Sequence, residues 1–108
     1  MYQPQRPSRS ETLHIRGLDY HVRLWGQSQP GHAPLVLLHG WMDTSASYQF
    51  MADAFSDAFA AQRLIVAPDW RGFGHTILPW PCDSFHFADY LADLDLLLDH
   101  YAGTQPVD

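Results

Sequence analysis

The chain has 108 residues, of which 46% are hydrophobic and 17% charged, which is the balance of a globular domain rather than a disordered segment. Twelve acidic residues oppose six basic ones, all arginines, and the formal net charge of −6 argues against a nucleic-acid partner, which would need a basic surface. A chain of this length accommodates one small domain.

The single cysteine, Cys82, excludes a disulfide within the chain, so a reducing compartment is the simplest expectation. Residues 1–10 are polar and lack the apolar core of a signal peptide, and we expect them to be a flexible tail before a domain over residues 11–108. No apolar run approaches the ~20 residues of a membrane span. These observations favour a cytoplasmic protein without a membrane partner.

The first expected elements are two short strands. Residues 12–15 and 20–25 alternate polar and apolar side chains, and residues 16–19 between them are typical of a hairpin turn. A loop rich in glycine and proline follows over residues 27–34. The apolar run Leu35–Leu38 then predicts a strand buried on both faces, which His39 and Gly40 end.

Helices and strands alternate from there on. Oxygen-bearing side chains at residues 43–45 are suited to the start of a helix, which we expect over residues 45–60. Residues 63–67 predict another strand, stopped by Pro68, and residues 69–81 a long shaped loop. Residues 106–108 lie where a new strand should begin.

The clearest helix is expected over residues 85–101, where apolar side chains recur at spacings of four and three. Asp83 or Ser84 is suited to cap its start, and Gly103 to follow its end. Asp89/Asp93 and Asp95/Asp99 are like-charge pairs at i,i+4 spacing, which would destabilise the helix by ~0.2–0.5 kcal/mol per pair.

This order predicts an α/β protein with a mostly parallel sheet, an antiparallel N-terminal hairpin and flanking helices, of which the chain builds about half. A strand that ends at a glycine and leads into a helix holds backbone N–H groups at the carboxyl end of the sheet. Open α/β sheets bind ligands there, and acyl-transfer enzymes need such donors to stabilise an oxyanion.

Two strand-end motifs make the expectation specific. Leu35-Val-Leu-Leu-His-Gly-Trp41 is followed by Arg63-Leu-Ile-Val-Ala-Pro-Asp-Trp-Arg-Gly-Phe-Gly74 and then by a helix rich in aspartate. In order and spacing these segments resemble the first half of an α/β-hydrolase, and the resemblance covers roughly residues 12–108. The family commonly has a serine two residues after the second glycine, where this chain has Thr76.

The resemblance implies roles for particular residues. The backbone N–H of Trp41 would form one arm of the oxyanion hole, and Gly40, Trp41 and Met42 would border the substrate pocket. His39 would support the loop rather than act as a base. Asp69 would brace the loop, although it could also be an acid or orient Arg71, and Gly72 and Gly74 would serve turn geometry.

The sequence also lacks parts that the family uses. No G-x-S-x-G motif occurs, and in relatives the nucleophile elbow begins about where residues 106–108 stand, so the catalytic acid and histidine would lie beyond residue 108. We therefore expect the N-terminal part of an esterase-like hydrolase, inactive alone, whose parent acts on a small-molecule ester or related carbonyl compound with a Ser or Asp nucleophile. The alternative is a non-catalytic interaction module, or a half-enzyme complemented by a second chain.

No metal or other cofactor is expected, because the remaining histidines show no metal-ligand spacing and favour surface or packing positions. A nucleotide-binding domain is disfavoured because neither G-x-G-x-x-G nor a P-loop occurs. Without a following strand, residues 35–38 would form an apolar edge with unpaired backbone groups, which favours self-association.

Overall fold

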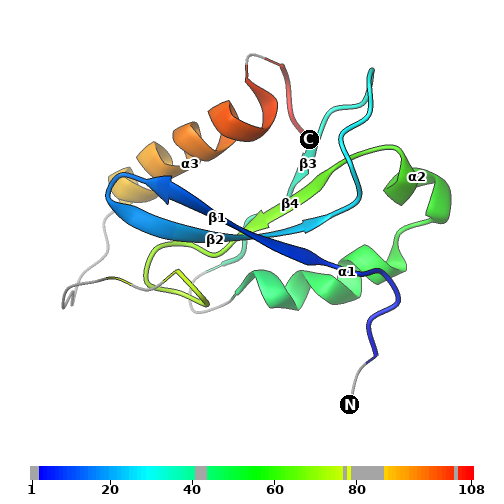
Figure 1. Cartoon of the computed structure of the whole chain (residues 1–108), viewed down its shortest axis with the longest axis horizontal. Coiled ribbons are helices and arrows are strands. Elements are labelled where there is room, and N and C mark those ends of the chain that lie inside the picture. Colours follow the sequence, from blue (N-terminus) through cyan, green and yellow to red (C-terminus); the bar gives the residue numbers. More distant parts are fainter. Residues whose placement is uncertain (1–2, 41–43, 77, 79–86, 104) are drawn as a thin grey trace.

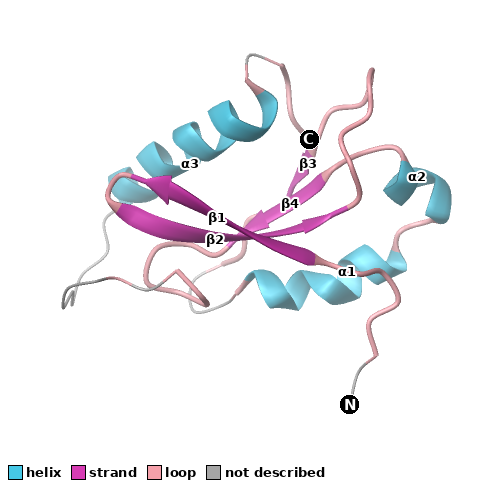
Figure 2. Ribbon diagram, viewed as in Figure 1, coloured by secondary structure: helices cyan, strands magenta, loops and turns pink. Residues whose placement is uncertain are grey.

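The computed structural model describes residues 3–40, 44–76, 78, 87–103 and 105–108. Within them, four strands form one mixed sheet in the order β1-β2-β4-β3, with β1 and β2 antiparallel, β2 and β4 antiparallel, and β3 parallel to β4 (Figures 1 and 2). The strands are β1 Arg9–Ile15, β2 Leu18–Trp25, β3 Leu35–Val36 and β4 Ile65–Pro68. The α/β fold class and the N-terminal hairpin predicted from the sequence are confirmed.

The hairpin turns through Arg16 and Gly17, which have φ angles of 50° and 81°. Two central residues with positive φ form the tight turn whose twist matches that of the strands. Strand β1 starts at Arg9, two residues before residue 11, at which the sequence analysis places the start of the domain. The Arg6 guanidinium also donates hydrogen bonds to the backbone oxygens of Ala52 and Phe55, so this part of the N-terminal stretch is held against the helices.

Strand β3 is shorter than predicted. Leu37 still donates its N–H to Val66 of β4 and is buried, but Leu38 is 39% exposed, so the prediction of a four-residue strand buried on both faces is wrong. The cause is its position at the end of the strand order, where β4 is its only strand neighbour in the described residues.

The outer edge of β3 is partly occupied. Val36 donates its N–H to the Asp108 oxygen at 2.8 Å, and Asp108 donates its N–H to the Pro34 oxygen at 3.0 Å. The C-terminal residue therefore lies beside β3 as the first residue of a parallel neighbour would. The predicted strand start at residues 106–108 agrees with this pairing, and the edge is less open than expected.

Helix α3, Phe87–Ala102, covers one face of the sheet, and α1, Gln49–Ala54, covers the other (Figure 1). Alternation along β2 explains both cores, because Leu18, Tyr20, Val22 and Leu24 pack with Leu97 of α3, whereas Trp25 packs with Ala52 of α1. No helix in the described ranges is long and apolar enough to cross a membrane.

The single helix predicted over residues 45–60 is three pieces. A 3-10 turn, η1, spans Ser45–Tyr48 and leads into α1, and α2 follows as Asp57–Ala61. The break occurs because Phe55 and Ser56 adopt extended conformations, and the Ser56 side chain accepts a hydrogen bond from the Phe59 N–H as the cap of α2.

Helix α3 ends as predicted. Gly103 follows its last residue with a φ of 61° and donates its N–H to the Asp99 oxygen. The predicted caps at its start, Asp83 and Ser84, lie outside the described residues.

Candidate active site

The two parallel strands, β3 and β4, have their carboxyl ends side by side at the same end of the sheet. His39 and Gly40 follow β3, and Asp69 follows β4, as parallel pairing requires. The His39 ring is buried, its Nδ1 lies 2.8 Å from the Gly40 oxygen, and its Nε2 accepts the Trp70 backbone N–H at 3.0 Å. These partners require a neutral ring with the proton on Nδ1. Both ring nitrogens are thus engaged with backbone.

Asp69 joins three segments of the chain. Its carboxylate is buried and accepts the Ser45 N–H at 2.6 Å, the His75 N–H at 3.1 Å and the His21 Nδ1–H at 2.6 Å. Burial opposes ionisation, but the hydrogen bonds from the Ser45 and His75 backbones outweigh it and hold the pKa of Asp69 below its usual value. The carboxylate therefore stays charged and ties η1, β2 and the loop after β4 together.

The loop after β4 has a shape that depends on glycine. Gly72 and Gly74 have φ angles of 82° and 55°, and a Cβ on Gly74 would lie 2.5 Å from the Asp69 Cγ. Gly74 is thus required by both its backbone conformation and the closeness of the carboxylate. Thr76 is buried, and its hydroxyl accepts the His21 N–H at 2.9 Å.

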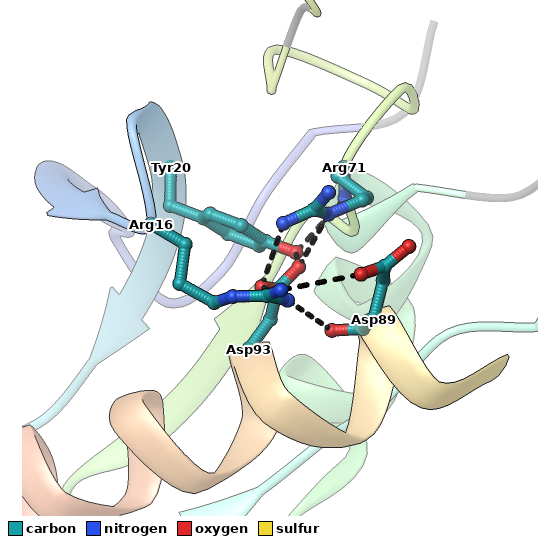
Figure 3. A network of polar contacts seen from close by, with 5 residues as sticks. All are labelled: Arg16, Tyr20, Arg71, Asp89 and Asp93. Carbon is teal, nitrogen blue, oxygen red and sulfur yellow. Dashed lines mark hydrogen bonds and ion pairs between the residues drawn. The ribbon is translucent and has the colours of Figure 1, made fainter. Parts of the chain in front are cut away.

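Arg71 binds Asp93 of α3 rather than Asp69 (Figure 3). Its Nε donates to Asp93 Oδ2 at 2.7 Å and its Nη2 donates to Oδ1 at 2.9 Å, a bidentate pair in which Asp93 is fully buried. The Tyr20 hydroxyl donates to Asp93 Oδ2 at 2.5 Å and accepts the Arg71 backbone N–H at 3.0 Å. Arg16 of the hairpin turn completes this network through Asp93 and Asp89.

The network corrects the interpretation of Asp89 and Asp93 as a repelling pair, because Arg16 bridges the two carboxylates and Arg71 binds Asp93. Burial and the hydrogen bond to Asp93 raise the pKa of Tyr20 well above its usual value, so the phenol remains a donor. The hydrogen bonds to Asp93 likewise raise the pKa of Arg71. Sequence reasoning missed Tyr20 and Asp93, although an aspartate on the apolar side of a helix was a usable signal.

The predicted oxyanion and pocket residues are only partly placed. Gly40 is exposed, and a Cβ on it would meet no atom within 4 Å, so space is open around the end of β3. Trp41 and Met42 lie outside the described residues.

The family model described as the α/β-hydrolase fold matches residues 33–107. The chain belongs to this family. Both strand ends, the loop after β4 and α3 fall inside the matched segment.

Solved structures support the same fold for this chain. The thioesterase domain from the curacin biosynthetic pathway superposes with a TM-score of 0.74 at 20% identity, over 94% of this chain and 35% of that one. The Cif epoxide hydrolase from Acinetobacter nosocomialis gives 0.71 at 19% identity, over 93% and 28%. The epoxide hydrolase CorEH gives 0.66 at 26% identity, over 89% and 30%.

The chain thus spans between 28% and 35% of the length of these three structures. No curated protein sequence matches it significantly. Among the described residues, no group of three His, Cys, Asp or Glu side chains is arranged to hold a metal ion.

Proposed function

We propose that this chain is the N-terminal part of an esterase-like α/β-hydrolase and that it supplies one arm of the oxyanion hole, the backbone N–H of Trp41. The observation that carries the proposal is the fixed end of β3. His39 is held between the Gly40 oxygen and the Trp70 N–H, and Asp69, the residue before Trp70, is itself held by the Ser45 N–H. Because the backbone just before Trp41 is held in place, its N–H would need little reorganisation to stabilise negative charge on the oxyanion.

The remaining machinery is proposed to lie beyond residue 108. A Ser–His–acid mechanism needs a nucleophile, a base and an orienting acid within hydrogen-bond reach, and His39 is unsuited as the base because backbone groups, not a nucleophile and an acid, occupy both ring nitrogens. The substrate class that we propose is a small-molecule ester or related carbonyl compound. The solved structures with this fold include a thioesterase and epoxide hydrolases, which supports a hydrolytic parent.

The first test is the activity of the 108-residue chain on a p-nitrophenyl ester, with a heat-denatured sample as control. We expect no repeated turnover. Steady release of many equivalents of nitrophenolate, in a sample where a serine-reactive probe labels no protein other than the chain itself, would overturn the assignment of the catalytic residues to a later segment.

The second test uses the protein extended through the G-x-S-x-G segment that the proposal expects downstream. Trp41→Pro removes the N–H, whereas the matched control Trp41→Ala keeps it. Because loss of one oxyanion donor costs about 10²–10³-fold in kcat, we expect that loss from Trp41→Pro and not from Trp41→Ala. Equal effects of both variants would refute the oxyanion role.

A further inference from the structure

A chain of three polar side chains lies on the face of the hairpin that α3 does not cover. The Ser10 hydroxyl of β1 lies 2.8 Å from His21 Nε2, and His21 Nδ1 lies 2.6 Å from Asp69 Oδ2. Since the ionised Asp69 carboxylate can only accept, His21 Nδ1 carries a proton, and in the neutral ring Nε2 is then the acceptor for the Ser10 hydroxyl. Nucleophile, base and orienting acid are thus connected in the order that activates a serine.

The environment of the three residues also fits such a role. Asp69 is buried and held by two backbone N–H groups, so it fixes the imidazole, while Ser10 is exposed and its hydroxyl can reach a reactant. Ser10 and His21 border an open hollow of about 410 Å³, which Thr12, Asp19, Arg23 and His75 also line. Arg23, which stands opposite Ser10 in the β1–β2 register, lines the same hollow, and its Nη1 donates to the Ser8 hydroxyl at 3.3 Å.

We propose that Ser10 is a nucleophilic serine that accepts acyl groups from activated esters, with His21 as its base and Asp69 as the positioning residue. Ser10 Oγ attacks the carbonyl carbon as its proton moves to His21 Nε2. The bond from carbon to the alcohol oxygen then breaks, the alcohol leaves with the proton from His21, and the acyl group remains on Oγ. This site is separate from the oxyanion arm proposed at Trp41 and needs no residue beyond 108.

The probe is an alkyl fluorophosphonate, which forms a P–O bond with an activated serine and expels fluoride, while the serine proton passes to the base. The purified chain is incubated with the probe and the modified serines are quantified by peptide mass spectrometry. Ser28, an exposed serine in the loop after β2, is the internal reference. We expect Ser10 to react roughly 10²-fold faster than Ser28, because a positioned general base contributes about 10²–10⁴-fold.

Variants separate activation from simple exposure. His21→Gln should lower the Ser10 rate to that of Ser28, whereas His14→Gln, which changes an exposed histidine on the same face, should leave it unchanged. Unfolding the wild-type chain in urea should equalise the two serines, a control that needs no variant to fold. Equal rates at Ser10 and Ser28 in the folded chain, or an unchanged Ser10 rate in folded His21→Gln, would overturn the proposal. Neither outcome depends on Trp41 or on ester turnover.

Discussion

Replacing Asp93 by alanine tests the buried network that joins the loop after β4 to α3. Asp93 is fully buried and accepts hydrogen bonds from Tyr20, Arg71 and Arg16. Its removal leaves the Arg71 guanidinium, whose side chain is 13% exposed, without its carboxylate. Breaking a buried ion pair on one side costs about 3–5 kcal/mol. We expect Asp93→Ala to lower the free energy of unfolding by that amount.

This loss is large for a protein of 108 residues, whose whole stability is expected to be about 5–16 kcal/mol at 0.05–0.15 kcal/mol per residue. At roughly 4–8 °C per kcal/mol, the melting temperature should fall by at least about 12 °C. The assay is urea unfolding and thermal melting followed by the helical circular dichroism signal. Asp95→Ala is the matched control, because Asp95 is an exposed aspartate of the same helix and should change stability by no more than about 0.5 kcal/mol.

A double-mutant cycle with Arg71→Ala identifies the partner. If the ion pair carries the effect, the double variant is more stable than the sum of the single losses predicts, by about 0.5–3 kcal/mol. The reasoning is refuted if Asp93→Ala costs no more than Asp95→Ala, or if the losses from Asp93→Ala and Arg71→Ala simply add.

Three further outcomes are expected. Gly74→Ala should cost more stability than Gly31→Ala, because both positions have positive φ but only a Cβ at Gly74 would strike the Asp69 carboxylate, and equal losses in urea unfolding would contradict this. Folding lowers the pKa of Asp69, so the stability that this carboxylate contributes should be lost as the pH falls below about 4. Folding raises the pKa of Tyr20, so the stability that this phenol contributes should be lost as the pH rises above about 10. In melts recorded against pH, Tyr20→Phe should reduce the loss of stability on the alkaline side. Deleting Val107 and Asp108 should increase self-association in sedimentation velocity, because it frees the backbone groups of Pro34 and Val36, whereas an unchanged sedimentation coefficient over a concentration series would argue against association through this edge.

The predictions from sequence that succeeded rest on local chemistry. The alternation of residues 20–25 predicted β2, residues 16–19 predicted the hairpin turn, and Gly103 predicted the end of α3. Each of these signals is complete within a few neighbouring residues. The order of the strand-end motifs gave the family because it reflects the topology of the whole sheet.

The predictions that failed depend on residues far apart in the chain. The extended conformation of Phe55 and Ser56, which interrupts the helix, is stabilised by the Ser56 cap of α2 and by the hydrogen bond from Arg6 to the Phe55 oxygen. The sequence predicted repulsion between Asp93 and Asp89, because the partners of Asp93, Arg16 and Arg71, lie 77 and 22 residues away in sequence. The exposure of Leu38 likewise follows from the place of β3 in the strand order and not from its composition.

The two buried carboxylates act on the same loop from opposite faces of the sheet. Asp69 accepts the backbone N–H of Ser45 on the α1 side of the sheet. Asp93 of α3 binds Arg71, which is the second residue after Asp69. Between them, Trp70 donates its backbone N–H to His39 at the end of the neighbouring strand. Because each carboxylate is satisfied by several donors, moving the loop would leave buried charges unpaired, which costs more than the hydrogen bonds themselves contribute. The position of His39 and Gly40 is therefore determined by contacts within residues 20–93, so this part of the chain organises the end of the sheet where β3 and β4 stop.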